Sequence, residues 1–233
     1  MSKLGFSNTI YLSEDPDQLE DGASFLADLD DDTRHELRLS GTRTVLGRGQ
    51  LLFSQGDRHS GVWLIESGQL RTFYVGHQGR EITLAYWTRG HFVGGPEIFG
   101  GGAHVWSADA YAVSTVTFLP GTLLRRLAER HSRFALALID GLVAKGKCYS
   151  ALVQMLATKS ATERLEQLLG ILASTHGRPT SEGILIDRLV TQDELAQLLG
   201  TSRQWLSASM EKLRQAGVVS IEKRQITLRR QHP

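Results

Sequence analysis

The sequence predicts an α+β fold: a roll of short β-strands, a long helix and a C-terminal winged helix-turn-helix. Glycines punctuate short β-rich runs between Thr42 and Pro120, apolar residues then recur at helical spacing, and two capped helices follow from Thr191. Domains typically hold about 100–150 residues, so a chain of 233 residues favours more than one. We expect a roll with an N-terminal helix over 1–120, a dimerisation helix over 121–157 and the winged module over 158–233.

Composition restricts the class of protein. Hydrophobic residues make up 41% and charged residues 22%, as in an ordinary globular chain. No apolar run approaches the roughly 18 residues that span a bilayer, and the polar, acidic N-terminus is unlike a signal peptide, so we expect a cytoplasmic protein with no membrane partner. The single cysteine, Cys148, excludes an internal disulfide, a thiolate zinc cage and a Cys-ligated iron–sulfur cluster within one chain.

Positive charge gathers near the C-terminus. The net charge is only +1, yet the chain from Arg203 onward carries seven Lys or Arg against two Asp or Glu. Such clustering is typical of a surface that contacts phosphates, and a solvated basic tail has the same composition. The capped helices beside it favour the first interpretation.

The N-terminal half is expected to begin with a polar segment that ends in a short amphipathic helix near residue 40. Its packing residues would be Phe25, Leu26, Leu29, Leu37 and Leu39. Five β-rich runs follow, with a hairpin loop at 75–80, and they predict an antiparallel roll or barrel. These runs are Gln50–Phe53, Val62–Glu66, Gln69–Val75, Glu81–Trp87 and Ala110–Leu119.

A helical segment follows Pro120. Its apolar positions recur at alternating four- and three-residue steps, and a period near 3.5 marks a seam against another helix. We expect that partner to be the same helix of a second subunit; packing on the chain's own roll is the alternative. Lys145 lies inside the seam, where a polar residue costs stability but fixes register. The seam residues are Leu138, Leu142, Lys145, Tyr149, Leu152 and Leu156.

After a hinge at 158–162, where Thr162 would cap a helix over 163–174, we expect a helix-turn-helix and two short strands. The second helix of this motif fits the major groove of DNA. Val218–Glu222 and Gln225–Leu228 alternate around a turn and would form the wing. Capping boxes are expected at Thr191 with Glu194 and at Thr201 with Gln204, and helix ends at Gly200 and Gly217.

The order of these parts, with a series of short motifs, resembles the CRP/FNR superfamily of bacterial transcription factors. The similarity runs from about Arg48 to Leu228. It implies a cyclic-nucleotide-binding-type roll (a double-stranded β-helix) that senses an effector. It also implies a homodimer that binds a pseudo-palindromic operator in double-stranded DNA, with RNA polymerase as a partner in an activator. The motifs are Arg48–Phe53, Gln55–Asp57, Val62–Gly68, Gly79–Ile82, Arg89–Gly94 and Thr201–Gln204.

The effector site departs from the family pattern. Cyclic-nucleotide-binding members follow Phe-x-Gly with Glu-Leu and place Arg-Ser further on. Here Gly95-Pro96 follows Gly94, and Trp106-Ser107 stands in the Arg-Ser place. A buried phosphate without its guanidinium loses a charge-assisted pair, so we expect an allosteric effector other than cAMP. The pocket would hold Gly94, Gly95, Pro96, Trp106, Tyr149 and Ser150, although the two aromatic residues fit a plain core equally well.

Two alternatives to a small organic effector stay open. Gas-sensing members of the family carry haem, and His77, His91 and His104 in the loops of the roll are candidate iron ligands. The other alternative is a regulator without a ligand, controlled by its abundance. Cys148 is expected to be inert core, with a redox role as its alternative.

The resemblance also assigns the DNA-reading positions. Family members read a half-site with an Arg, a Glu one residue on and an Arg five residues after the first; these positions hold Arg203, Gln204 and Ala208. Arg pairs with guanine and an amide suits adenine, so we expect a half-site related to, but distinct from, the family's TGTGA. Ser202, Ser207 and Thr191 would contact phosphate or cap helices, Trp205 would meet a thymine methyl or the core, and Leu206 and Met210 would face the core.

A metal-dependent enzyme built on the roll is the rival class. Cupin-like oxygenases need His-x-His with a nearby carboxylate, and many hydrolases carry Gly-x-Ser-x-Gly. The sequence contains neither motif. We therefore expect no catalytic residues and no metal site.

Overall fold

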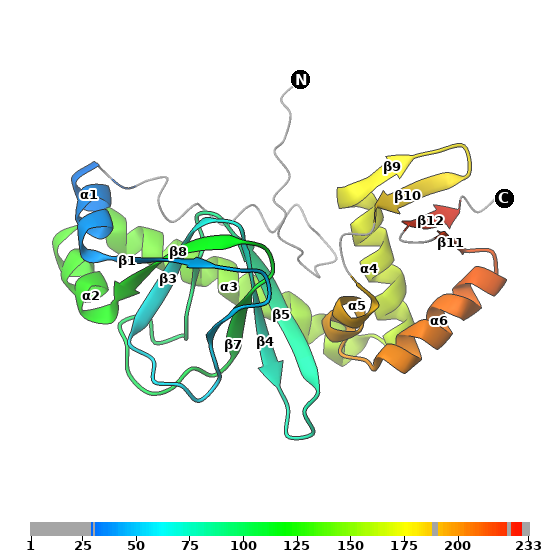
Figure 1. Cartoon of the computed structure of the whole chain (residues 1–233), viewed down its shortest axis with the longest axis horizontal. Coiled ribbons are helices and arrows are strands. Elements are labelled where there is room, and N and C mark those ends of the chain that lie inside the picture. Colours follow the sequence, from blue (N-terminus) through cyan, green and yellow to red (C-terminus); the bar gives the residue numbers. More distant parts are fainter. Residues whose placement is uncertain (1–28, 30, 188–190, 223–224, 230–233) are drawn as a thin grey trace. The chain divides into compact units, whose positions relative to one another are not determined.

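The computed structural model describes residues 29, 31–187, 191–222 and 225–229. They form two compact units, one ending at Ala151 and the other beginning at Leu152 (Figure 1). Each unit contains its own sheet and helices, as the α+β prediction requires. Within the described residues, no helix combines the length and apolar character needed to cross a bilayer.

The first unit is an antiparallel roll of two four-stranded sheets, preceded by helix α1 (Asp31–Ser40). The sheets have the orders β1-β8-β3-β6 and β2-β7-β4-β5. Trp87 and Ile65 are fully buried between them. The strands are β1 Thr42–Leu46, β2 Leu51–Phe53, β3 Gly61–Ser67, β4 Gln69–Val75, β5 Glu81–Thr88, β6 Phe92–Val93, β7 Ser107–Ala110 and β8 Ser114–Pro120.

Two details of the expected strands were wrong. The run Ala110–Leu119 is not one strand, because the chain bends at 111–113, where the Tyr111 amide donates to the Gln69 carbonyl, and β8 starts beyond the bend. The strands β1, β6 and β7 were not expected; β6 has two residues and β7 has no β-branched residue, whereas β1 has an ordinary strand composition and was overlooked. They pair with strands distant in sequence, which local patterns do not indicate.

The N-terminal helix was placed correctly, but not all of its packing residues were. Leu29 and Leu37 are buried in one hydrophobic cluster with residues of α2 (Gly121–Arg130), whereas Leu39 is exposed. Residues two positions apart in a helix are turned about 200° from each other, so Leu37 and Leu39 cannot share one face. Phe25 and Leu26 lie outside the described residues.

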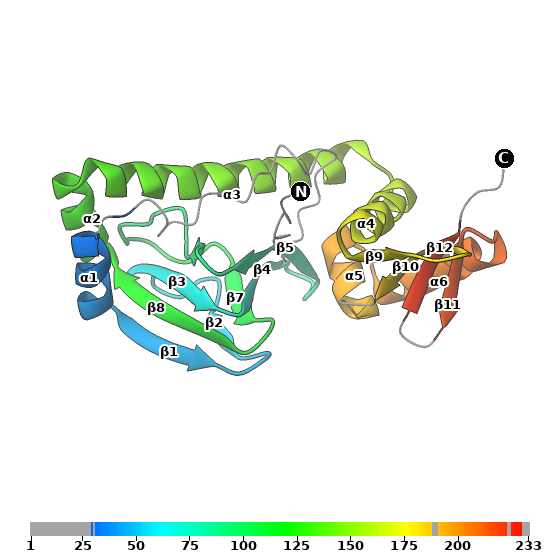
Figure 2. The same cartoon turned by 90° about the horizontal axis from the view of Figure 1, so that it is seen from above.

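The segment after Pro120 forms two helices rather than one. Helix α2 ends at Arg130, His131 takes an extended conformation, and α3 (Ser132–Thr158) follows. Figure 2 shows α3 lying along the roll in the first unit. Leu138 joins the hydrophobic core that α2 forms with the roll, and Tyr149 packs against the core inside the roll.

Most of the expected seam of α3 is covered by the chain itself. Leu138, Lys145 and Leu152 are buried, and Leu142 packs on the core of the first unit. Leu156 lies in the second unit beside Gly200. A 3.5-residue period identifies an apolar face, but it does not say which surface covers that face. The alternative of packing on the roll is correct for this face.

In the described residues, the second unit combines the end of α3 and the helices α4, α5 and α6 with a four-stranded sheet of order β11-β12-β10-β9. Helix α4 is capped by Ser160. Its hydroxyl accepts from the Glu163 amide, and the Glu163 carboxylate accepts from the Ser160 amide. Thr162 is therefore not the N-cap, and the helix begins earlier than expected. The elements are α4 Ala161–His176, β9 Gly177–Pro179, β10 Gly183–Asp187, α5 Gln192–Leu199, α6 Arg203–Gln215, β11 Val219–Glu222 and β12 Gln225–Arg229.

The helix-turn-helix and its wing are confirmed as elements. Thr191 and Glu194 form the expected capping box, and Gly200 ends α5 in the left-handed conformation, with φ of 62°. A left-handed turn at this point is easiest for glycine, and it lets α6 leave at a new angle. The strands β11 and β12 pair in the predicted register, with Glu222 opposite Gln225.

Candidate nucleic-acid interface and effector site

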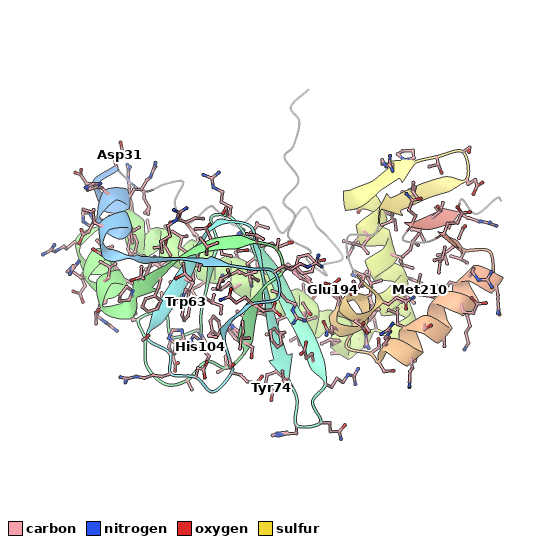
Figure 3. The ribbon with its side chains drawn as sticks, in the orientation of Figure 1. Asp31, Trp63, Tyr74, His104, Glu194 and Met210 are labelled. Carbon is pink, nitrogen blue, oxygen red and sulfur yellow. The ribbon has the colours of Figure 1, made fainter. Side chains whose placement is uncertain are left out.

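The packing of α6 determines which of its side chains face outward. Leu206 and Met210 are buried against the module, as expected, and Trp205 is partly buried. Figure 3 labels Met210 on this helix and Glu194 at the start of α5. Because a helix repeats every 3.6 residues, positions between these apolar ones point away from the core. Arg203, Gln204, Ser207 and Ala208 are accordingly exposed.

Arg203 and Asp193 form an ion pair between the first turns of α6 and α5. The Arg203 Nη1 lies 3.3 Å from the Asp193 carboxylate, and the two side chains are 67% and 55% exposed. Exposed pairs of this kind contribute about 0–1 kcal/mol. A weak pair orients the guanidinium without preventing it from exchanging partners.

The cap of α6 differs from the expected one. The Ser202 hydroxyl accepts from the Trp205 amide at 3.1 Å, so Ser202 is the N-cap and not Thr201. The Thr201 hydroxyl is buried without a hydrogen-bond partner. Of the three hydroxyl residues offered for phosphate or capping, Ser202 and Thr191 act as caps, and Ser207 is free of any cap role on the exposed face.

Near its C-terminal end, α6 contains an ion pair between two of its own residues. Arg214 donates to both carboxylate oxygens of Glu211, one turn earlier, at 2.8 and 2.6 Å. These hydrogen bonds lower the pKa of Glu211 to about 2. The Arg214 charge is thus balanced within the helix, unlike that of Lys212, for which the structure gives no ion pair with a described residue.

The six expected effector residues fall into separate places. Trp106 and Tyr149 meet, with ring centroids 5.4 Å apart, and Tyr149 also meets the ring of Trp87 edge-on at 6.3 Å. Pro96 and Ser150 are exposed. The structure therefore brings the two aromatic residues together against the core of the roll.

Gly94 and Gly95 are buried against a residue that the sequence analysis did not select. The Gly95 amide donates to the His59 Nε2 at 2.5 Å, and a Cβ at Gly95 would lie 2.7 Å from the His59 ring. Only glycine fits this approach. His59 carried no motif in the sequence, and its partner in the turn is 36 positions away.

His59 is one of a buried histidine pair. Its ring centroid lies 4.4 Å from that of His104, which stacks on Phe53 at 3.9 Å and lies near Trp63 (Figure 3). Burial lowers the pKa of His104 to about 4, helped by the proximity of His59, and it also lowers the pKa of His59. Both rings are therefore neutral at neutral pH. His77 is exposed and His91 packs on Trp87, so the three expected iron ligands occupy three different surroundings.

Lys145 is buried in the first unit. Its side chain lies on the face of α3 that meets the roll, and the residue is 8% exposed. The Nζ sits 3.9 Å from the ring centroid of Trp87 and 4.3 Å from that of Phe92. Burial lowers the pKa of this amine to about 7. Cation–π contacts contribute about 2 kcal/mol when desolvated, which offsets only part of the cost of burying an ammonium.

Cys148 follows one turn later and is buried as well. Burial raises the pKa of its thiol to about 12, so the thiolate that redox chemistry requires does not form at neutral pH. Among the residues that the structure describes, no group of three or more His, Cys, Asp or Glu side chains is arranged to hold a metal ion.

Comparison with known families and proteins agrees with this architecture. A model of the cyclic nucleotide-binding domain matches residues 43–131, and a model of the Crp-like helix-turn-helix domain matches residues 163–232. The global nitrogen regulator of Synechococcus elongatus is 24% identical over 78% of this chain and 82% of its own. The fumarate and nitrate reduction regulatory protein of Escherichia coli is 23% identical over 78% of this chain and 72% of its own.

Solved structures share the fold at lower identity. The global regulator CLP of Xanthomonas campestris, described as c-di-GMP responsive, superposes with a TM-score of 0.76 at 19% identity, covering 86% of this chain and 100% of its own. A CooA mutant from Carboxydothermus hydrogenoformans gives 0.67 at 20% identity, covering 82% and 84%. With both domains matched in this order, the chain belongs to the CRP/FNR family of DNA-binding transcription regulators.

Proposed function

We propose that this regulator is a homodimer that reads a pseudo-palindromic operator, under the control of a small effector other than cAMP held by its roll. The observation that carries the proposal is the exposed N-terminal face of α6, where Arg203, Gln204 and Ser207 point outward from a packed helix. Operator binding implies action in the bacterial cytoplasm, and RNA polymerase would be a partner if the protein activates.

Base reading follows from the chemistry of this face. Arg203 would donate to the O6 and N7 of a guanine, the commonest specific contact, and Gln204 would pair with an adenine. Ala208 offers only a methyl group, so this position would contribute through a thymine methyl or not at all. The remaining exposed hydroxyl, Ser207, would contact a phosphate and fix the position of the helix.

Dimerisation would use an apolar stripe on α3 that the sequence analysis missed. Four large apolar side chains on this helix are between 48% and 63% exposed, and the first three follow one another at steps of three and four residues. The stripe lies away from the face that packs on the roll and repeats as a coiled-coil seam does. We propose a second copy as its partner, because a helix-turn-helix protein reads two half-sites as a symmetric pair. The residues are Leu136, Ile139, Val143 and Val153.

A haem-based sensor is the second candidate, because both ring nitrogens of His104 are buried without a partner. The surroundings do not fit a haem, however. Phe53 covers the His104 ring at 3.9 Å and His59 contacts it at 4.4 Å, so the neighbouring space is filled by side chains. We therefore favour an organic effector, and the absence of a Soret band in the purified protein is the expected result.

Light scattering and operator selection test the proposal together. The wild type should elute as a dimer and enrich an inverted repeat from random DNA. Ile139→Glu should convert it to a monomer with much weaker operator binding, whereas Arg133→Glu, an exposed change on the same helix, should leave both properties intact. A monomeric wild type that still selects one half-site would contradict the dimer, and a protein that selects no sequence would contradict the operator role.

A further inference from the structure

The histidine pair lies where two loops of the roll meet. His59 belongs to the loop between β2 and β3, and His104 belongs to the loop that precedes β7. The two residues are 1% and 2% exposed, and their ring centroids are 4.4 Å apart. Backbone hydrogen bonds join the loops beside the rings, since the Gly56 amide donates to the His104 carbonyl at 2.8 Å and the Gly101 amide to the His59 carbonyl at 3.0 Å. The rings are therefore part of the contact that closes the two loops.

His104 anchors a segment that buries little else. We call residues 100–105 the glycine loop. Residues 101–103 and Val105 are exposed, so in this stretch the buried side chain is that of His104. The three glycines at 100–102 have φ of 83°, 123° and 65°, and glycine gains more conformational freedom than other residues when a loop opens. Closure of the glycine loop thus depends on His104 and on the backbone hydrogen bonds.

The hydrogen bonding of the pair requires neutral rings. The His59 Nε2 accepts from the Gly95 amide at 2.5 Å, so this nitrogen carries a lone pair and not a proton. Both ring nitrogens of His104 are buried without a hydrogen-bond partner among the described residues. A protonated imidazole has two N–H donors. Protonation would therefore set two donors against each other at His59, and at His104 it would bury a charge without an acceptor.

The charged groups near the pair do not offset this cost. The Asp57 carboxylate raises the pKa of one ring and the Glu97 carboxylate that of the other, but burial is the larger cause and lowers both pKa values. Both carboxylates are exposed, as is Arg58 on the same loop. The strands β2 and β3 contribute Phe53 and Trp63, which carry no charge. In water the rings would regain a pKa of about 6.5, so a proton favours the open loop.

We propose that His59 and His104 form an acid-sensitive latch. With neutral rings the latch holds the glycine loop against residues 56–59, and protonation of the pair breaks the hydrogen bond to Gly95 and releases the glycine loop. Ile98, buried in the cluster that α2 forms with the roll, would keep the chain between Gly95 and the glycine loop in place. The latch lies within the first unit and does not depend on the proposed dimer, operator or effector.

Hydrogen exchange of the full chain between about pH 7.5 and 5 measures the opening, once the intrinsic pH dependence of exchange is divided out. The amides that join the two loops, those of Gly56, Gly101 and His104, should lose protection below about pH 6.5. The loss should reach about tenfold per pH unit for each histidine, because the released rings bind protons at their ordinary pKa. The amides of Gly49 and Ala110, which bond elsewhere in the first unit, should lose less.

Variants assign the pH dependence to the pair. His104→Phe keeps a ring beside Phe53 but takes up no proton, so it should reduce the slope of protection against pH. Adding His59→Gln, whose side-chain oxygen can accept from the Gly95 amide, should remove the slope. His77→Phe, at an exposed position, is the matched control and should keep the wild-type slope.

Constant protection of the glycine-loop amides across this range in the wild type would overturn the latch. An equal loss at Gly49 and Ala110 would also overturn it, since the whole unit and not one loop would then be opening. A double variant that keeps the wild-type slope would show that other groups titrate, with the same consequence. If the double variant does not fold, the wild-type comparison of Gly101 with Ala110 still decides.

Discussion

The Arg203 guanidinium lies 3.3 Å from the Asp193 carboxylate, so the first turn of the second helix of the helix-turn-helix is tied to the first turn of the helix before it. Both side chains are more than half exposed, and such a pair contributes about 0–1 kcal/mol. In the proposed complex, guanine edges and phosphates would therefore compete with Asp193 for Arg203. In the free protein the pair orients the guanidinium at the start of α6.

Asp193→Asn should release Arg203 at little cost to the fold. We expect the free energy of unfolding to change by less than about 1 kcal/mol and operator affinity to rise severalfold, because a negative charge beside the DNA is removed. Calorimetry and fluorescence anisotropy measure the two effects. Weaker binding by Asp193→Asn would mean that the pair is needed to hold Arg203 in place when DNA is bound.

Ser202→Ala and Thr201→Ala should differ although the residues are adjacent. Ser202 accepts from the Trp205 amide, and loss of such a cap costs about 0.5–2 kcal/mol. Thr201 has a buried hydroxyl without a partner, so removing it should cost less than removing the Ser202 hydroxyl. Hydrogen exchange of the α6 amides measures the local stability. A larger loss of α6 stability in Thr201→Ala than in Ser202→Ala would show that Thr201 is the cap.

Stability of the first unit should rise with pH between about 7 and 8.5. Burial lowers the pKa of Lys145 to about 7 from 10.5, so the unfolded chain binds more protons in this range and each pH unit favours the folded state by up to about 1.4 kcal/mol. Above about pH 8.5, ionisation of Cys148 in the unfolded chain opposes the gain, since burial raises its folded pKa to about 12. Lys145→Met should flatten the rise, and Lys147→Met should keep it. An unchanged slope in Lys145→Met would show that another group titrates.

Acid should destabilise the roll through its histidine pair. The pKa of His104 is lowered to about 4 from 6.5, so the unfolded chain takes up the proton first and stability is lost as pH falls from about 6.5 towards 4. His104→Phe, which can keep the stack on Phe53, should lessen this loss, and His77→Phe at an exposed turn should not. Denaturant melts across this range give the comparison. Parallel curves for His104→Phe and the wild type would refute the assignment.

Elements whose signals lie close together in the sequence could be predicted. For this reason the prediction was most accurate for the helix-turn-helix and its wing. Caps such as Thr191 with Glu194, and the left-handed Gly200, depend on residues within one turn of each other. The hairpin of β9 and β10 was missed because β9 has three residues and includes Pro179, which weakens a strand pattern. The strands of the roll were located by their glycines, but their pairing depends on distant partners.

The residues of the candidate sites could likewise be predicted where their signals are local, and not where they depend on distant partners. The outward position of Arg203 follows from helical periodicity once Leu206 and Met210 are assigned to the core. The sequence did not show which face of α3 meets the roll, because Leu138 and Ile139 both belong to runs with three- and four-residue steps, and only the packing separates the two runs. The contact of His59 could not be predicted from the sequence. It depends on the Gly95 amide, which is 36 positions away, and not on a local motif.

The central claim is that Arg203 reads a base, and a base-by-base affinity measurement tests it most directly. The operator half-site would be substituted at each position in turn and bound by the wild type, by Arg203→Ala and by Arg214→Ala, which removes the same charge from the far end of the helix. Arg203→Ala should lose about 1–3 kcal/mol of discrimination at one guanine and keep salt-dependent binding to all sequences, while Arg214→Ala keeps the wild-type profile. Loss of affinity that is uniform over every position in Arg203→Ala would contradict the account.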